Sequence, residues 1–379
     1  MKITDVETIF IDEYLFVKVH TDQGITGLGE SGAWAHLESS AAAVQKFKTY
    51  LIGQDPLRIE HHWQYLYRWT HFRGTAIMGA LSAIDIALWD IAGKYFGVPV
   101  YQLLGGKTRD KVRTYLWIRG DTEEKLVQKC IDAKKKGFTA VGHLNPFFDV
   151  PHNIPYYDTY TGKIKKAVEA IKHCREAVGD DVDICVEIHT RLTPPEAIEL
   201  ARGIAEFRPY FYEDPIYPDN IDVMGYVAQN IQIPIATGER LHNIYEFAML
   251  LNRKAAQYLR TCVCACGGLT ASKKIAAMAE ANYVGIVPHN PLSPVSTAAC
   301  VQLAACIPNL ALQEYSGGEG IAPKSEIVKQ PLKVEGGYII VPDAPGIGIE
   351  LADDAQERYP YRPLVIDTRL NLDGSVIDQ

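Results

Sequence analysis

The sequence predicts an α/β protein, a modified TIM barrel of (β/α)₇β type with an N-terminal α+β domain. Three observations support this prediction: eight short apolar runs that recur from about residue 112, helix-length segments between them, and an N-terminal stretch with a different pattern. Apolar runs of this length suit strands that are buried on both faces. Strands that alternate with helices are typical of a parallel barrel.

Residues 1–111 are predicted to form the α+β domain. Apolar and polar residues alternate from Ile3 to Glu30 around the turn signal Asp22-Gln23-Gly24, which favours antiparallel strands. From Ala76 to Phe96 the apolar residues have helical spacing, and Gly97 follows directly as a helix stop. No flexible linker follows, so we expect this domain to pack on the barrel.

The barrel domain is predicted over residues 112–316. Its eight expected strands read, in chain order, VRTYLWI, FTAVGHL, VDICVEI, PYFYEDP, IPIATGE, YLRTCVCA, YVGIVPH and LALQEYS. Residues 317–379 are rich in Gly and Pro and contain one short strand-like run, GGYIIVP. We expect them to form a separate C-terminal segment.

Composition and charge favour a small-molecule partner. The formal charge is -8 and the charges are interspersed, which argues against a nucleic-acid or anionic-lipid surface. No long uninterrupted apolar window and no signal-peptide pattern is visible, so we expect no membrane partner and a cytoplasmic location. The eight cysteines lack the paired spacing of a disulfide framework and are expected to be free thiols.

Three of these cysteines, Cys262, Cys264 and Cys266, are close enough in sequence to suggest a metal site. On a single strand, however, an i, i+2, i+4 set points its side chains in the same direction, and no C-x-x-C pair is present elsewhere. We therefore expect buried thiols that partly line the site. A zinc hydrolase is also disfavoured, because the first expected strand carries no H-x-H pair.

Polar residues at the carboxyl ends of the expected strands are the candidate site residues, because a parallel barrel has its active site at that end. They are Glu187, His189, Glu213, Glu239, Cys262, His289 and Glu314. The candidate residues of successive strand ends are 23 to 27 residues apart, about one βα unit. Adjacent strands therefore present these side chains at the same end of the barrel.

Glu187, Glu213 and Glu239 predict a metal site. Three carboxylates in one place repel each other unless a cation neutralises them. Ligation by oxygen alone suits Mg²⁺ better than Zn²⁺. His189 shares a strand with Glu187, and His289 lies four strands onward, on the opposite side of the mouth. One imidazole on each side of a metal-bound substrate is a layout for removing and delivering protons.

Further motifs extend over nearly the whole chain. They are Gly24, Gly27 and Glu30; Ser82-Ala83-Ile84-Asp85 to Ala87-Leu88-Trp89-Asp90; Gly105-Gly106; Arg208-Pro209 ahead of Glu213-Asp214-Pro215; Gly238-Glu239-Arg240; Gly267-Gly268-Leu269-Thr270; Pro288-His289-Asn290-Pro291; and Gln313-Glu314. In these motifs the chain resembles the enolase superfamily, in its mandelate racemase subgroup, and within it the D-galactonate dehydratase-like sugar acid dehydratases.

The resemblance implies a capping domain joined by the C-terminal segment, a barrel that holds Mg²⁺, and a homo-oligomer. It implies dehydration of a sugar acid, a galactonate-like aldonate, to a 2-keto-3-deoxy acid. By position, the resemblance implies that Glu187, Glu213 and Glu239 bind Mg²⁺. It implies that His289 removes the proton α to the carboxylate, that His189 protonates the leaving β-hydroxyl, and that Glu314 hydrogen-bonds the substrate carboxylate or its enediolate. The residues implied to contact the substrate are His143, Asn145, Arg240 and Cys262.

The chain departs from the family pattern at three positions. Glu187 stands where the first metal ligand is usually Asp, Cys262 where an Asp normally pairs with the histidine base, and His143 where the subgroup often has Lys. A neutral thiol cannot orient an imidazolium as a carboxylate does. Two alternatives therefore stay open: an epimerase or racemase of a hydroxy acid, and a weakly active or non-catalytic protein that binds metal and acid.

Overall fold

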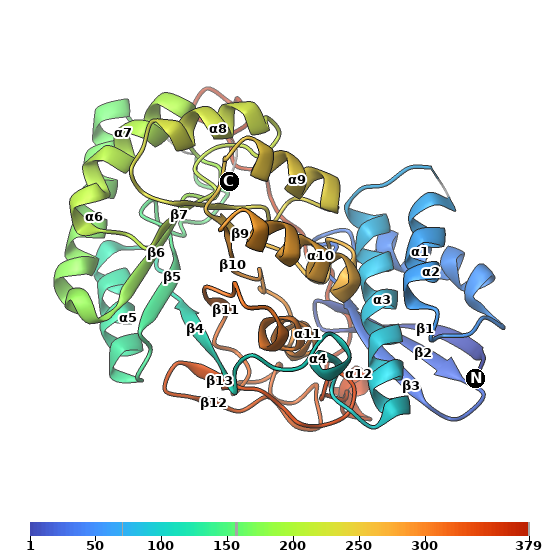
Figure 1. Cartoon of the computed structure of the whole chain (residues 1–379). Coiled ribbons are helices and arrows are strands. Elements are labelled where there is room, and N and C mark those ends of the chain that lie inside the picture. Colours follow the sequence, from blue (N-terminus) through green and yellow to red (C-terminus); the bar gives the residue numbers. More distant parts are fainter. Residues whose placement is uncertain (70, 156–157, 378–379) are drawn as a thin grey trace.

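The computed structural model describes residues 1–69, 71–155 and 158–377, and it places a barrel domain beside a smaller α+β domain (Figure 1). In the α+β domain, an antiparallel sheet has the order β1-β2-β3. Its elements are β1 (Ile3–Ile11), β2 (Tyr14–Thr21), β3 (Thr26–Ser31), α1 (Leu37–Leu51), α2 (Ile59–Trp69), α3 (Thr75–Phe96) and α4 (Val100–Leu103). The predicted N-terminal strands are confirmed.

The predicted long helix is confirmed as α3, which packs on β3. It ends where Gly97 takes a left-handed φ of 69° and donates its N–H to the carbonyls of Gly93 and Lys94. Among the described residues this one helix has the length and composition to cross a membrane, and 83% of its apolar window is buried inside the protein. Its apolar surface therefore serves the core of the α+β domain and the contact with α10 (Gly268–Ala281).

The barrel alternates eight parallel strands with seven helices. The strands are β4 (Lys111–Trp117), β5 (Ala140–Leu144), β6 (Asp183–Glu187), β7 (Phe211–Glu213), β8 (Ile235–Thr237), β9 (Tyr258–Leu259), β10 (Gly285–Ile286) and β11 (Gln313–Tyr315). The helices are α5 (Glu123–Lys135), α6 (Tyr160–Val178), α7 (Pro194–Ile204), α8 (Ile221–Gln229), α9 (Ile244–Asn252), α10 (Gly268–Ala281) and α11 (Pro294–Cys306), with short 3₁₀ turns at Gly179–Asp181 and Ala205–Phe207.

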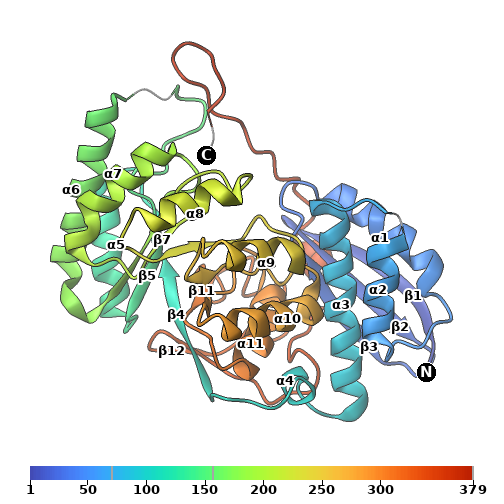
Figure 2. The same ribbon diagram turned by 45° about the horizontal axis from the view of Figure 1, so that its top comes forward.

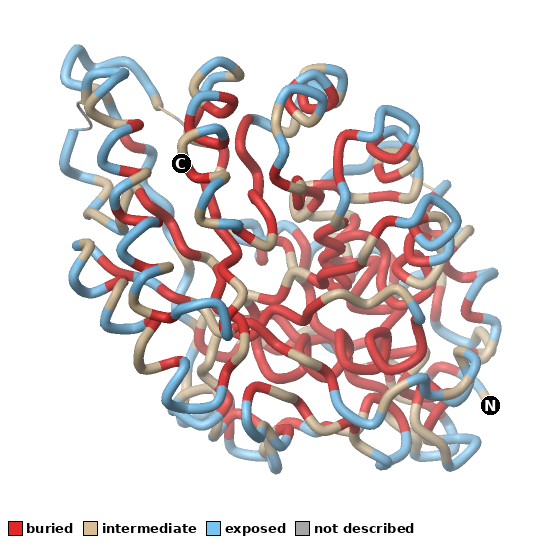
Figure 3. The backbone as a smooth tube through the Cα atoms, turned by 60° about the vertical axis from the view of Figure 1, so that its left-hand side comes forward, coloured by how far each residue is buried: buried red, intermediate tan, exposed pale blue. Residues whose placement is uncertain are grey.

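The strands follow one another around a ring. Hydrogen bonds join them in the order β10-β9-β8-β7-β6-β5-β4, and β11 pairs with β4 on the other side. A parallel bridge between Ile286 and Leu310 brings β10 beside the chain that enters β11. All eight predicted strands are present, and the (β/α)₇β fold is confirmed. Figure 3 shows the buried residues concentrated in the interior of the molecule and the exposed residues on its periphery.

Two expectations about the strands are wrong. His189 does not share a strand with Glu187, because β6 ends at Glu187 and His189 lies in the turn that follows. The run YLRTCVCA forms a strand only at Tyr258–Leu259, and the cysteines that follow lie in a turn. The carbonyl of Cys262 accepts the N–H groups of Ala265 and Cys266, at 2.9 and 2.8 Å. A turn does not present i, i+2 and i+4 side chains on one face, so the three thiols do not form a row. All eight cysteines are buried and free.

The C-terminal segment contacts both domains. It contains β12 (Val334–Glu335), β13 (Tyr338–Ile340), which pairs antiparallel with β4, and α12 (Ala355–Arg358). Tyr359 accepts the N–H of Asp12 at 2.9 Å, and Tyr361 donates its hydroxyl to Glu38 at 2.6 Å. Arg369 then donates to the carbonyl of Val150, 2.5 Å away. Figure 2 shows this stretch running from the α+β domain toward α6 and α7.

Two buried acids of the α+β domain cap helices of the barrel. Glu30, at the end of β3, accepts the N–H groups of Ser293 and Ser296 at the start of α11, at 3.1 and 2.8 Å. Asp85 of α3 accepts the N–H of Thr270, in the first turn of α10, at 3.0 Å. Four N–H groups at each helix start lack partners within the helix, so these carboxylates stabilise both helices.

Candidate active site

Glu187, Glu213 and Glu239 converge at the carboxyl ends of three adjacent strands. Glu187 ends β6, Glu213 ends β7, and Glu239 lies two residues after β8. One carboxylate oxygen from each lies within 4.8 Å of the others, a spacing that suits ligands of a single cation. The structure thus brings together the three acids that the sequence predicted to meet.

Glu187 and Glu213 are buried and the side chain of Glu239 is 11% exposed, and burial disfavours their charged forms. Desolvation, reinforced by the charges of Glu213 and Glu239, raises the pKa of Glu187 well above its usual range. Burial also raises the pKa of Glu213 to about 8, although Arg260 opposes this. Glu239 behaves differently, because the charges of His289, His189, Arg240 and Arg260 together outweigh its desolvation and lower its pKa to about 2. A divalent cation at this point would neutralise carboxylates that have little contact with water.

The hydrogen bonds of these acids leave one oxygen that fits a metal ion. Oε1 of Glu187 accepts the N–H of His189 at 2.6 Å, and Oε1 of Glu213 accepts from the guanidinium of Arg260. Oε2 of Glu213 is buried and, within the described part of the chain, has no hydrogen-bond partner. An orphaned carboxylate oxygen inside a cluster of acids is the donor that a hard divalent cation needs.

The two predicted catalytic histidines lie on either side of Glu239. Nε2 of His289 is 3.5 Å from Oε2 of Glu239, and Nε2 of His189 is 4.0 Å from its Oε1. Nδ1 of His289 is buried without a hydrogen-bond partner among the described residues. The acid that faces His289 is therefore Glu239, and it faces the Nε2 side of the ring.

Glu314 is held by three donors. Its oxygens accept from the indole N–H of Trp117, from Arg260 at 2.7 Å and from the main-chain N–H of Asn290 at 2.5 Å. Arg260 is the largest of the influences that lower the pKa of Glu314 against its desolvation. A carboxylate in this state accepts hydrogen bonds and has no proton to donate.

The residues predicted to contact substrate differ in their surroundings. His143 stacks on Trp117, with 4.5 Å between ring centroids, and forms a T-shaped pair with His189. Arg240 lies beside Glu239, 3.8 Å from Nε to Oε1. Asn145 is 4% exposed and accepts the N–H of Phe147 at 2.9 Å, which stabilises the turn after β5.

Cys262 is embedded in the protein interior. It is 2% exposed and belongs to the main apolar core. Burial, followed by the neighbouring Cys266 and Cys300, raises the pKa of its thiol well above the usual value. The side chain is therefore a neutral thiol.

Left-handed backbone occurs at the ends of three neighbouring strands. His143, His189 and Asp214 have φ values of 50°, 56° and 37°. Non-glycine residues rarely adopt this conformation, and it tends to persist where the surrounding structure holds a functional side chain in place. At His189 the bend returns the N–H to Glu187, so the metal-site acid and the histidine orient each other.

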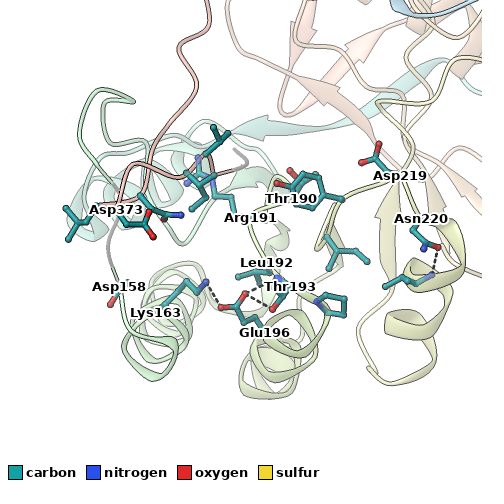
Figure 4. Close-up of a pocket in the computed structure, with 18 residues that line it drawn as sticks. Asp158, Lys163, Thr190, Arg191, Leu192, Thr193, Glu196, Asp219, Asn220 and Asp373 are labelled. Atoms are coloured by element: carbon teal, nitrogen blue, oxygen red, sulfur yellow. Dashed lines mark hydrogen bonds and ion pairs between the residues drawn. The ribbon is translucent and has the colours of Figure 1, made fainter.

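A cavity of about 750 Å³ lies next to this cluster (Figure 4). It is lined by the loops after β6 and β7, the start of α6 and residues 371–377 of the C-terminal segment. The three glutamates do not line it, but Thr190 and Arg191 do, and they directly follow His189. Lys163 and Glu196 form an ion pair of 2.6 Å in its wall.

Two residues of the cluster were not anticipated from the sequence. Arg260 is 1% exposed and contacts both Glu213 and Glu314, and Trp117 donates to Glu314. Both lie within expected strands, where a single arginine or tryptophan gives no periodic signal. The one available signal was position, because Arg260 directly follows β9 and could have been included with the other polar strand ends.

Fold and site together define an enolase-type barrel enzyme with a cluster of three acids that could hold a metal ion. The family model "Mandelate racemase / muconate lactonizing enzyme, N-terminal domain" matches residues 2–105, and "Enolase C-terminal domain-like" matches residues 125–355. The chain belongs to the mandelate racemase/muconate lactonizing enzyme family of the enolase superfamily.

Relatives and solved structures agree with this placement. A D-galactonate dehydratase of Ralstonia pickettii is 37% identical over 93% of this chain and 92% of its own length. One from Xanthomonas euvesicatoria is 36% identical over 96% and 95%. A structure of a mandelate racemase/muconate lactonizing enzyme-like protein from Roseovarius has a TM-score of 0.90 at 32% identity, covering 97% of this chain and 98% of that one.

An enolase from Agrobacterium radiobacter, crystallised with Na and L-malate, has a TM-score of 0.92 at 30% identity and covers 100% of both chains. Similarity to dehydratases over nearly the whole length makes this chain a lyase of the hydro-lyase type.

Proposed function

We propose that this protein is a Mg²⁺-dependent sugar acid dehydratase that acts on an aldonate of the galactonate type. The observation that carries the proposal is the cluster of three glutamate oxygens within 4.8 Å, flanked on both sides by an imidazole. The two D-galactonate dehydratases described above support the substrate class. The L-malate in the Agrobacterium enolase is a hydroxy acid, which agrees with a site for such acids.

Glu187, Glu213 and Glu239 would hold the cation. When bound, Mg²⁺ would supply positive charge beside the substrate carboxylate and so make the neighbouring α-proton more acidic. An imidazole alone is too weak a base to remove that proton, which is why the acid cluster and the histidines are needed together.

His289 is proposed as the base and His189 as the acid. His289 would accept the α-proton at Nε2, the ring nitrogen that faces Glu239. The negative charge of Glu239 stabilises the imidazolium that results. His189 would then deliver a proton to the departing β-hydroxyl, and the product would tautomerise to a 2-keto-3-deoxy acid.

The remaining polar residues are proposed to position the substrate. Arg240 and His143 lie beside Glu239 and His189 and would contact its carboxylate or hydroxyls. For Glu314, the three donors argue that it accepts hydrogen bonds and orders Arg260 and Trp117.

Proton NMR in D₂O with Mg²⁺ tests the proposal against a panel of aldonic, uronic and aldaric acids. We expect one aldonate to give a deuterated 2-keto-3-deoxy product. Exchange of the α-proton without loss of the hydroxyl would instead identify an epimerase or racemase, for which two histidines facing one carboxylate are also suited. Absence of exchange throughout the panel, with Mg²⁺ bound, would overturn the dehydratase assignment for these acids.

A further inference from the structure

Arg260 is a buried arginine that contacts the acidic cluster. It follows β9, is 1% exposed, and its guanidinium forms ion pairs with Glu213 on one side and with Glu314, 2.7 Å away, on the other. A third arm donates to the carbonyl of Val287 at 3.1 Å. The guanidinium therefore joins residues from four strand ends of the barrel, those of β7, β9, β10 and β11.

The contacts divide the two oxygens of Glu213 between different partners. Oε1 accepts from Nε of Arg260, whereas Oε2 is buried and has no hydrogen-bond partner in the described residues. In Glu213, therefore, one oxygen is held by Arg260 and the other is left for a ligand. In Glu187, Oε1 accepts the N–H of His189.

We propose that Arg260 is a positioning residue of the metal site, whose guanidinium holds Oε1 of Glu213 so that Oε2 faces the divalent cation, with Glu314 anchoring the guanidinium from the far side. This inference rests on the proposed metal site. Arginine suits the task because its planar fork contacts two carboxylates at once, whereas a lysine ammonium is a single point charge.

Arg260 also makes the cluster tolerable before a cation binds. Buried carboxylates without a cation are costly, and removing one partner of a buried ion pair leaves the other charge uncompensated. The arginine compensates Glu213 and Glu314, which leaves the approaching cation to interact with Glu187, Glu239 and one oxygen of Glu213. A methionine at position 260 would let the Glu213 side chain rotate away from the cation.

Binding of Mn²⁺, followed by the EPR signal of the free ion, tests this role without relying on turnover. In R260M we expect the affinity for Mn²⁺ to fall by about tenfold or more, the usual effect of removing a group that orients a metal ligand. R260K should fall between R260M and the unaltered protein, because lysine keeps the charge but cannot hold both acids. Unchanged or tighter binding in R260M would overturn the proposal.

R113M is the matched control. Arg113 of β4 pairs with Asp183 at 2.7 Å, at the opposite ends of the barrel strands from the acidic cluster. Its loss should lower the melting temperature and leave the Mn²⁺ affinity within about twofold, since it does not contact a ligand. An equal loss of affinity in R113M and R260M would show a general weakening of the barrel and would overturn the positioning role.

Two outcomes keep this inference separate from the function itself. If the unaltered protein binds no Mn²⁺, the proposed metal site fails. If the unaltered protein binds Mn²⁺ and R260K binds it with the same affinity, the guanidinium fork has no positioning role, and that result stands even if R260M does not fold.

Discussion

Asp85 of α3 caps α10 by accepting both the main-chain N–H and the hydroxyl of Thr270, at 3.0 and 2.6 Å. The two residues belong to different domains and lie 185 positions apart. Ser82, one turn earlier on α3, accepts the N–H of Gly267 at 2.9 Å. The α+β domain thus fixes the start of α10, the helix that follows the turn at Cys262. The sequence motifs that begin at Ser82 and at Gly267 supply the two sides of this contact.

Replacing Asp85 by alanine should destabilise the protein by about 2 kcal/mol, because two buried donors of Thr270 lose their acceptor. Urea unfolding measures this difference. Thr159→Ala is the control, since Thr159 caps α6 within its own exposed segment and its loss should cost about 1 kcal/mol or less. A loss in the Asp85 variant no larger than in the control would contradict the importance of the contact.

Asp85 should also make stability depend on pH. Burial raises its pKa from 3.8 to about 7. Between these values the folded protein keeps a proton that the unfolded chain has lost, so the free energy of unfolding falls as pH rises and levels off above about 7. Between about pH 5 and about pH 8, the free energy of unfolding should decrease less in Asp85→Asn than in the unaltered protein, because asparagine has no ionisable group at this position. Equal decreases in both proteins would disprove this.

Gly268→Ala should be severely destabilising. Its φ is +71°, and an added Cβ would lie 2.2 Å from Oδ2 of Asp85. We expect a loss of about 3 kcal/mol or more, because backbone strain and a clash with a buried carboxylate add together. Gly97 has a φ of +69° but open space around it, so Gly97→Ala should cost about 1 kcal/mol. Similar melting temperatures for the two variants would argue against the clash.

His289→Asn should abolish exchange of the substrate α-proton in D₂O while Mg²⁺ still binds. Asparagine cannot act as a base, and the three acids that would hold the cation are unchanged. His20→Asn is the control, since His20 lies on β2 beside Glu7, in the other domain. Deuterium incorporation at the normal rate in the His289 variant would remove His289 as the base.

Binding of Mg²⁺ should release protons and strengthen as pH rises. Burial and neighbouring acids raise the pKa of Glu187 well above its usual range, and burial raises that of Glu213 to about 8, so in the metal-free protein both acids hold their protons to a higher pH than usual. A cation needs the ionised forms and must displace those protons. Calorimetry in two buffers of different ionisation enthalpy measures the release, and a binding heat independent of the buffer would contradict it.

The sequence predicted the barrel well because its signals are local and repeat. Each strand is an apolar run and each helix an interval of suitable length, and both can be recognised without knowing what they pack against. The metal-site acids followed from the same regularity, since Glu187, Glu213 and Glu239 recur once per βα unit. The extent of the sixth strand was not predictable, because the turn at Cys262 depends on how α10 meets the α+β domain.

The sequence by itself determined the order of strands and helices, the family, and the polar residues that reach the mouth of the barrel. Only the tertiary structure decided their partners: Arg260 between Glu213 and Glu314, Glu239 between His189 and His289, and Asp85 on Thr270. The physical reason is one of range. Periodicity is set within a few residues, whereas these contacts join strands and domains whose distance depends on how the ring of strands is formed and how the two domains pack.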